Sequence, residues 1–163
     1  MSDASEAPGP LPWQGGCRCD KLRFQVNMAP ILSAACHCAG CQRMSASAFS
    51  LTLIVPGPGL EIIEGEPVVG GLHAPELQHM CCDHCKSWVF TRVEQFGIVN
   101  VRATMLDTPR WFVPYMETCV SEKLPWATTP AVQHFEQFPA PDSYPTLLAE
   151  YAAWARERQL PVA

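Results

Sequence analysis

The spacing of the cysteines is the feature that most constrains this chain. Seven of its nine cysteines fall into short groups, Cys17-x-Cys19, Cys36-x-Cys38-x-x-Cys41 and Cys82-x-x-Cys85. Two pairs and a triplet fit one closed four-thiolate zinc site and one three-thiolate site with an open position, which is the division between structural and catalytic zinc. The arithmetic therefore predicts two zinc sites of different kinds.

The triplet at residues 36–41 is compact enough to hold one ion by itself. Its Cys-x-Cys step is followed by Ala39-Gly40, which we expect to form a tight turn that brings the three sulfurs together. The first and last pairs would then meet across the fold and join an early hairpin to a strand about sixty residues later. Such a site stabilises a fold strongly, by roughly 10 kcal/mol or more in small domains, because it does not exist in the unfolded chain.

Other partitions remain open at this stage. His37 could join the triplet and His84 the last pair, but His37 would point away from its neighbours in an extended segment. We expect both histidines to act as N–H donors rather than ligands. Cys81 and Cys119 are expected to be inert buried thiols. A set of disulfides is a further alternative, disfavoured by the odd cysteine count and the lack of an export signal.

The remaining composition predicts a single, mainly β domain. The chain has 163 residues, and its sixteen prolines and ten glycines divide it into short elements. Strand-like alternation begins at Leu22, and further runs of β-forming residues occupy residues 48–55, 60–65, 66–72, 88–94, 96–106 and 110–116. Short antiparallel strands of this number are typical of a sandwich or an open barrel.

The two ends of the chain differ from this centre. Residues 1–13 have no periodicity and indicate a flexible tail, and residues 14–140 carry all the cysteine motifs. Within residues 141–163, the apolar spacing of residues 146–159 behind Pro145 predicts one amphipathic helix. We expect it to pack on the domain or on a partner subunit, which makes a homodimer conceivable.

Charge and hydropathy exclude two classes of partner. The formal charge of −5 leaves no basic face for nucleic acid. The N-terminal stretch lacks a basic and apolar leader pattern, and no apolar run reaches the length of a membrane span, so a cytoplasmic location is expected.

Several motifs together resemble those of a known family. They are GGCRCDKLRF (15–24), ACHCAGCQRMSASAF (35–49), CDHC (82–85), VNVRATMLDTP (99–109) and VSEKLPW (120–126). Their order is similar to that in glutathione-dependent formaldehyde-activating enzymes and their centromere-protein-V-like relatives, over roughly residues 14–140.

The resemblance implies an Mss-like zinc β-fold and a carbon–sulfur lyase reaction, in which glutathione adds to formaldehyde to give S-hydroxymethylglutathione. It implies a structural zinc and a catalytic zinc, whose ligands would be Cys17, Cys19, Cys82 and Cys85 for the first and Cys36, Cys38 and Cys41 for the second. A zinc on three thiolates suits the binding of a substrate thiol as thiolate. Arg43, directly after the triplet, is a candidate clamp for a glutathione carboxylate.

The chain also departs from the family pattern. Asp20 and Lys86 stand where glycine usually follows the cysteine pairs, and residues 45–49 read SASAF where SGAPF is common. The segment Glu117–Val120 replaces a common His-Ile-Trp-Val, and Glu117 itself is expected at the surface. These changes leave the zinc sites intact and alter the surroundings of the substrate.

Two other functions compete with the enzyme. One is a non-catalytic zinc-binding interaction module on the same fold, in which a fourth protein ligand closes the second site. The other is a redox or metal-buffering protein that uses the spare thiols, although a well-patterned β domain exceeds what a metal store needs. An open position and a pocket beside the triplet would favour the enzyme.

Overall fold

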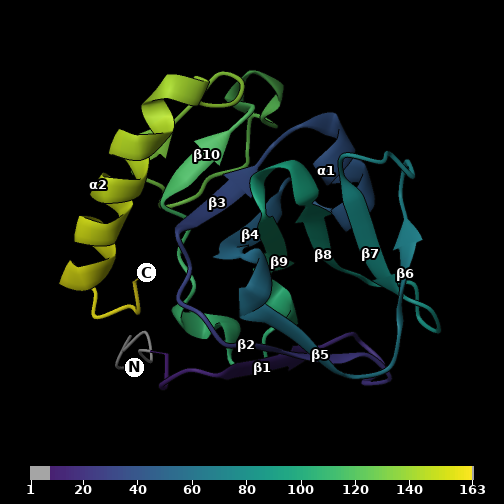
Figure 1. The fold of residues 1–163 in the computed structure, drawn as a ribbon. Coiled ribbons are helices and arrows are strands. Elements are labelled where there is room, and N and C mark those ends of the chain that lie inside the picture. Colours follow the sequence, from purple (N-terminus) through teal and green to yellow (C-terminus); the bar gives the residue numbers. More distant parts are fainter. Residues whose placement is uncertain (1–7, 163) are drawn as a thin grey trace, which may run out of the picture.

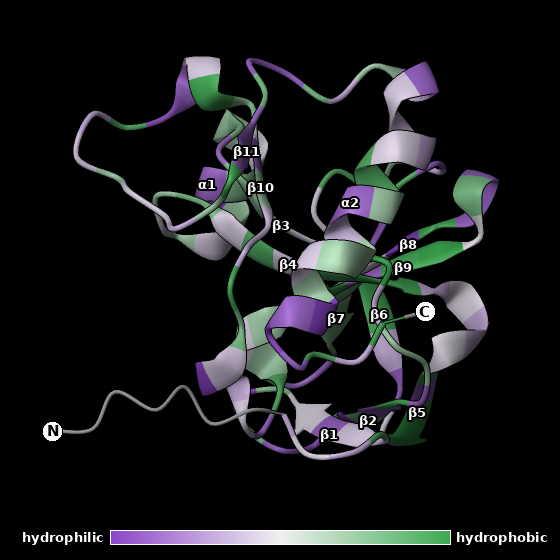
Figure 2. Ribbon diagram, turned by 90° about the vertical axis from the view of Figure 1, so that its left-hand side faces the viewer, coloured by the Kyte–Doolittle hydropathy of each residue, from purple (hydrophilic) through white to green (hydrophobic). Residues whose placement is uncertain are grey.

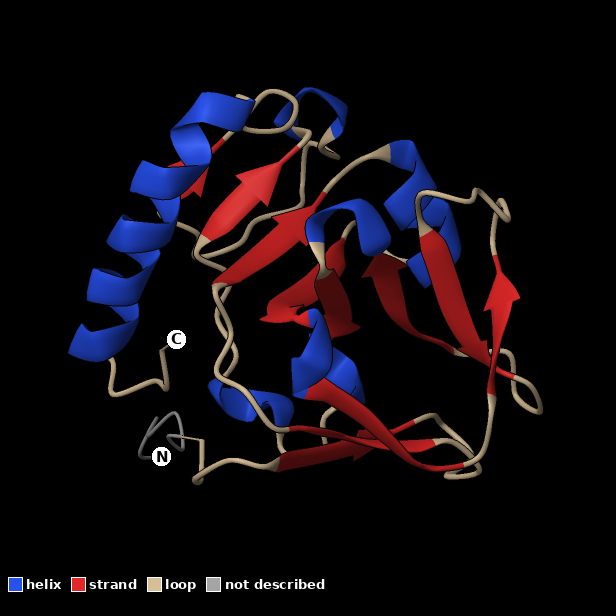
Figure 3. Ribbon diagram, in the orientation of Figure 1, coloured by secondary structure: helices blue, strands red, loops and turns tan. Residues whose placement is uncertain are grey.

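The structure is a computed structural model that describes residues 8–162, so most of the predicted tail, residues 1–7, lies outside the described part. The described chain consists mainly of β-strands in two open sheets, with a long helix near its C-terminal end (Figures 1 and 3). This architecture confirms the predicted mainly β fold with a C-terminal helix.

The smaller sheet has three antiparallel strands in the order β1-β2-β5. They are β1 (Trp13–Gly16), β2 (Arg23–Val26) and β5 (Leu60–Glu64). Phe24 and Val26 are fully buried while Arg23 and Gln25 are half-buried, as the alternating sequence predicts for a strand covered on one face.

The larger sheet has eight strands in the order β11-β10-β3-β4-β9-β8-β7-β6. Their bounds are β3 (Leu32–Cys36), β4 (Ser50–Pro56), β6 (Pro67–Gly70), β7 (Gln78–Cys82), β8 (Trp88–Val93), β9 (Ile98–Arg102), β10 (Met116–Thr118) and β11 (Gln133–His134). All neighbours are antiparallel except β10, which runs parallel to both β3 and β11. Figure 2 shows β8 and β9 in the green of hydrophobic residues, in keeping with their burial.

The main hydrophobic core lies between the two sheets. Phe24 and Val26 of the smaller sheet pack with Leu53, Val89 and Val101 of the larger one, all of them fully buried. Trp13, the last residue of the predicted tail, begins β1 and packs its ring 4.7 Å from that of Trp111. The ordered domain therefore begins no later than this residue.

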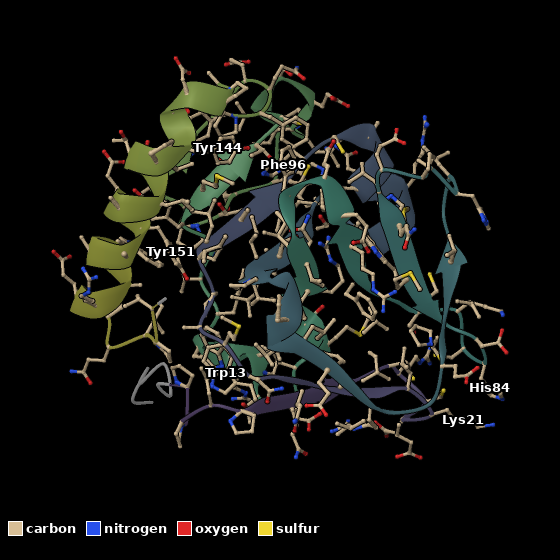
Figure 4. All side chains as sticks on the ribbon, viewed as in Figure 1. Trp13, Lys21, His84, Phe96, Tyr144 and Tyr151 are labelled. Atoms are coloured by element: carbon tan, nitrogen blue, oxygen red, sulfur yellow. The ribbon has the colours of Figure 1, made fainter. Side chains whose placement is uncertain are left out.

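The C-terminal helix α2 (Tyr144–Glu157) packs on the larger sheet. Pro145 occupies its first turn, as predicted, and its buried side chains are Leu147, Tyr151, Trp154 and Ala155. Tyr151 lies on the side of α2 that faces β3 (Figure 4). A second core cluster forms there, with Leu32, Ala34, Tyr115 and Met116 from the sheet side.

Three local predictions need correction. A second helix, α1 (Ala39–Ser45), forms where a tight turn was predicted, because Cys38 caps its N-terminus. Residues 110–116 are not a strand, since Pro109 starts a 3-10 turn (Pro109–Trp111) and only Met116 joins β10. The strands β1, β3, β7 and β11 were not predicted, because short runs of glycine, small, histidine or cysteine residues carry little β signal.

The remaining elements are single 3-10 turns. They are η1 (Gly57–Gly59), η2 (Glu94–Phe96), η3 (Ala103–Met105), η5 (Val120–Glu122) and η6 (Pro141–Ser143), with the Pro109–Trp111 turn as η4. Among residues 8–162, no helix is long and apolar enough to cross a membrane.

Candidate metal centres and the adjoining pocket

Four thiols from two distant segments form the first candidate metal centre. Cys17 and Cys19 lie between β1 and β2, and Cys82 and Cys85 lie at the end of β7 and in the turn that follows. All four sulfurs lie within 4.8 Å of one another. Figure 4 labels Lys21 in the first of these segments and His84 in the second. The structure thus brings the first and last cysteine pairs together, as predicted.

The sulfur separations suit zinc. Cys17 Sγ lies 3.5 Å from Cys19 Sγ, and Cys19 Sγ lies 3.8 Å from Cys82 Sγ. A tetrahedral zinc with bonds of about 2.3 Å requires sulfurs about 3.8 Å apart. The donor set and its spacing therefore fit a closed four-thiolate site.

Left-handed backbone turns position these thiols. Asp20 and Lys86 have φ values of 59° and 58°, and each follows its cysteine pair directly. The Asp20 amide donates to the Cys17 carbonyl at 3.1 Å, and the Lys86 amide donates to that of Cys82 at 3.0 Å. Glycine adopts this conformation without steric cost, and it is the residue that the resemblance led us to expect at both positions. This chain adopts the same left-handed turn with Asp20 and Lys86, which carry side chains, at the two positions.

Three thiols from one short segment form the second candidate centre. Cys36 ends β3, Cys38 caps α1, and Cys41 lies in the first turn of that helix. The Cys41 amide donates to Cys38 Sγ at 3.3 Å, and the three sulfurs lie within 4.8 Å of one another. In the described part of the chain, this group gathers no fourth His, Cys, Asp or Glu atom at the same separation.

The three thiols also share charge. A hydrogen bond with the Cys41 thiol lowers the pKa of Cys36 to about 5 against the opposing effect of burial, and Thr118 contributes a second bond. The bond with Cys36, together with burial, raises the pKa of Cys41. The group therefore favours one thiolate stabilised by its neighbours, a chemistry suited to a soft divalent cation.

His37 is not part of either thiol group. It is fully buried, and its Nε2 lies 3.0 Å from Oε1 of Glu117. Its backbone amide donates to the Thr118 carbonyl at 3.0 Å, which continues the pairing of β3 with β10. As predicted, this histidine bonds a partner other than the metal. It links the junction between β3 and α1 to β10.

Glu117 is buried, so its predicted place at the surface is wrong. Its side chain is 1% exposed, since β10 lies inside the sheet between β3 and β11. Besides His37, it accepts hydrogen bonds from Lys123 Nζ at 2.7 Å, Thr129 Oγ1 at 2.8 Å and His134 Nδ1 at 2.8 Å. Burial acts to raise the pKa of Glu117, but these donors outweigh it and lower the pKa to about 2.

The remaining thiols and the second histidine lie outside both groups. Cys81 and Cys119 are buried, and His84 is exposed in the turn after Cys82. Burial and the neighbouring Cys36 and Cys38 raise the pKa of Cys119 to about 12, so it is a neutral thiol beside the triplet. Both thiols fit the prediction of buried, unreactive side chains.

A pocket of about 360 Å³ adjoins the three-thiol group. It is lined by Met44, Ser45, Ser47, Phe49, Ser50, Leu51, Lys86, Ser87, Trp88, Arg102, Thr104 and Met105. The cysteines themselves are not lining residues, but Ser50 pairs with Cys36 across β3 and β4, and Arg102 interacts electrostatically with Cys41 and Cys36. These two residues connect the pocket to the thiols.

The predicted clamp Arg43 is exposed on α1 and does not line the pocket. Arg102, which the sequence reasoning did not single out, lies in the pocket instead. The alternation of Val99 and Val101 predicts Arg102 on the outer face of its strand, so no pattern signalled its burial. The only hint was its place in the motif VNVRATMLDTP.

The altered SASAF segment lines the pocket in part. Ser45, Ser47 and Phe49 are lining residues, and Ala46 ends α1 with a φ of 50°. Ala46 stands where the family pattern has its glycine, so a third departure from glycine again falls on left-handed backbone. The SASAF segment therefore retains the left-handed turn but places different side chains beside the pocket.

An open mainly β domain with two cysteine groups of metal-ligand geometry defines a cysteine-rich metal-binding class. Residues 12–122 match the family model described as glutathione-dependent formaldehyde-activating enzyme, and the chain belongs to this family. No curated protein matches the chain. A crystal structure of a Rhodobacter sphaeroides protein is 16% identical, with a TM-score of 0.49 over 58% of this chain and 87% of that one.

Proposed function

We propose that this protein is a zinc-dependent carbon–sulfur lyase that acts on the adduct of a small thiol and an aldehyde. The family name points to glutathione and formaldehyde as the pair, with S-hydroxymethylglutathione as the adduct. The observation that carries the proposal is the three-thiol group beside a pocket, in a chain whose other four clustered thiols form a group of their own.

In this proposal the two groups have different roles. Cys17, Cys19, Cys82 and Cys85 hold a structural zinc, and Cys36, Cys38 and Cys41 hold a catalytic one. When bound by three thiolates, zinc supplies a position at which a substrate sulfur is held as thiolate. Among residues 8–162 no fourth ligand joins the three thiols, which supports this assignment over a closed interaction module.

The chain's own residues supply position and surroundings. His37 and Glu117 fix the junction that carries Cys36 and Cys38, and the Cys38 cap fixes α1. Trp88 and Phe49 give the pocket apolar walls that exclude water. The reaction needs only orientation and proton transfer, since a carbon–sulfur bond forms, the carbonyl π bond opens, and the thiol proton ends on the carbonyl oxygen. The hydroxyls of Ser47 and Thr104 line the same pocket.

The test replaces one thiol of the triplet and compares it with a thiol outside both groups. Cys38→Ser should bind one zinc fewer than the unaltered protein and form the adduct at least about 100-fold more slowly, because thiolate stabilisation worth several kcal/mol is lost. Cys81→Ser is the matched control, since Cys81 is buried and belongs to neither group. It should retain both zinc ions and full activity.

Zinc is measured by elemental analysis, and adduct formation by exchange NMR with glutathione and formaldehyde. Full activity of Cys38→Ser after the loss of one zinc would show that the triplet is not the catalytic centre. Two zinc ions in the unaltered protein without any adduct formation would favour the interaction module.

A further inference from the structure

Arg102 is a buried cation without a carboxylate partner. The residue is 7% exposed, and its guanidinium lies over the Trp88 ring at 4.1 Å. Its Nη2 donates to the Asn100 carbonyl at 3.3 Å, and its Nε is buried without a hydrogen-bond partner. Within residues 8–162, no Asp or Glu oxygen comes within salt-bridge distance of it.

A buried arginine in this state requires compensation. An unpaired charge in the interior is costly, and stacking on an aromatic ring offsets only part of that cost. The Nε of Arg102 has no acceptor among the described residues, so the guanidinium retains an unused donor. Arginine offers a planar fork of donors that matches a carboxylate.

The pocket that Arg102 lines has a cationic and hydroxyl-rich character. Its charged lining residues are Arg102 and Lys86, and none is acidic, although the chain as a whole carries a charge of −5. Five hydroxyl groups complete the polar part of the lining, from Ser45, Ser47, Ser50, Ser87 and Thr104. The chemistry on offer is that of a site for an anionic small molecule.

Lys86 provides an independent observation at the mouth of the pocket. Its backbone is left-handed, with a φ of 58°, a conformation that is strained for a non-glycine residue. Its side chain is 66% exposed, with Nζ 2.9 Å from Asp83. A lysine thus stands at a turn that glycine would occupy without strain, and it lines the pocket while its charge is paired with Asp83.

We propose that the pocket binds a small molecule that bears a carboxylate, and that Arg102 is the specificity-determining residue that binds this carboxylate. Lys86 adds attraction at the entrance. The inference rests on the proposed function for the identity of the ligand, which is then a mercapto acid, a class that includes glutathione and smaller molecules. Because Ser50 lines the same pocket and pairs with Cys36 across β3 and β4, a carboxylate on the Arg102 guanidinium leaves the thiol end of such a molecule on the side of the triplet.

The first experiment compares two isosteric thiols on the zinc-loaded full chain. Isothermal titration calorimetry with 3-mercaptopropionate and 3-mercaptopropionamide should show about 10- to 100-fold tighter binding of the acid, the range expected for charge-assisted hydrogen bonds. This comparison needs no variant, so it does not depend on whether a substitution at a buried site folds. Equal binding of the two thiols, or binding of neither, would overturn the proposal.

Variants then test whether Arg102 causes the preference for the acid. Arg102→Gln should abolish the preference for the acid and leave the weak binding of the amide unchanged. Arg92→Gln is the matched control, because Arg92 also lies over an aromatic ring, 5.6 Å from the Phe90 centroid, but does not line the pocket. Lys86→Gln, at an exposed position, should reduce the preference by about 2- to 3-fold. If Arg102→Gln instead loses zinc and its binding of the two thiols weakens by the same factor, the role of Arg102 is to balance the charge of the triplet. That result would overturn the proposal.

A kinetic experiment shows whether the thiol or the aldehyde carries the carboxylate. It also distinguishes failure of this proposal from failure of the proposed lyase function. Adduct formation is measured with 3-mercaptopropionate and formaldehyde, and with 2-mercaptoethanol and glyoxylate. A fall of at least 10-fold on Arg102→Gln confined to the first pair supports the thiol as the carboxylate carrier, whereas one confined to the second pair overturns the assignment to a mercapto acid. Charge-selective binding without any adduct formation would uphold the pocket and refute the lyase. Adduct formation that is equally fast with 3-mercaptopropionate and 3-mercaptopropionamide would uphold the lyase and refute the carboxylate-binding pocket.

Discussion

The two cysteine groups use the same ligand chemistry for different structural ends. The four-thiol group joins the β1–β2 hairpin of the smaller sheet to the β7–β8 turn of the larger one, and Cys19 and Cys82 are 63 positions apart. The three-thiol group lies within residues 36–41, at one end of β3. A metal on the first group closes a long loop and ties two sheets together, while a metal on the second constrains little beyond its own turn.

This contrast also appears around the groups. The four-thiol group is fixed by turns of its own backbone, at Asp20 and Lys86. The three-thiol group is supported from behind by the buried pair of His37 and Glu117, and it adjoins a pocket. This contrast agrees with the proposed division, in which the nonlocal thiols stabilise the fold and the local thiols bind a ligand.

The largest expected effect on stability comes from a substitution in the four-thiol group. Cys82→Ser should lower the free energy of unfolding by on the order of 5 kcal/mol or more, because the metal that joins the two sheets loses a ligand. Cys38→Ser should lower it by roughly 1–2 kcal/mol, since only a short local loop is affected. Thermal and urea unfolding with zinc analysis measure both. Similar losses in the two variants would contradict the division of roles.

A pH titration tests the support behind the three-thiol group. The pKa of Glu117 is lowered from 4.5 to about 2, so its contribution is present above pH 4.5 and is lost as the pH falls toward 2. The shift corresponds to roughly 3 kcal/mol. The stability gap between the unaltered protein and Glu117→Gln should therefore shrink over that window in urea unfolding. The exposed Glu66 gives the control, since Glu66→Gln should show no gap at any pH. A gap that stays constant from pH 6 to 2 would contradict the assignment.

The smallest expected effect concerns the turn that follows the triplet. Ala46→Gly should stabilise the protein by about 0.5–1 kcal/mol, because the left-handed strain at a φ of 50° is relieved and exceeds the entropy cost of glycine. Ala153→Gly, at an exposed position inside α2, should instead destabilise it by about 1 kcal/mol. Urea unfolding measures both changes, and a loss of stability in Ala46→Gly would show that the alanine makes contacts beyond its backbone.

Much of the fold and of the thiol grouping was predictable. The alternation around Phe24 and the helical spacing around Tyr151 identified β2 and α2, since a covered strand and a packed helix impose their periods on the sequence. The cysteine spacing identified both groups, which the structure brings together as predicted. Where the signal was weak, as in β3 and β7, the strands form because neighbouring strands hydrogen-bond them.

The pocket was less predictable. Arg43 was the candidate clamp because it follows the triplet directly, yet its helical position leaves it exposed, and Arg102 from a distant strand lies in the pocket. Glu117 was expected at the surface, because a lone charged residue is usually solvated. Its burial depends on donors from three other segments, at His37, Lys123 and His134. A sequence pattern contains no record of such partners.

The sequence by itself determined which thiols group, because short spacings fix the separation of side chains within a few residues and leave few ways to share them. The tertiary structure alone decided what surrounds these thiols. It covers the outer face of β9 over Arg102, places β10 inside the sheet with Glu117, and leaves a pocket beside the triplet. The physical reason is that burial of a charge depends on which distant segments cover it and what they donate, and packing sets both.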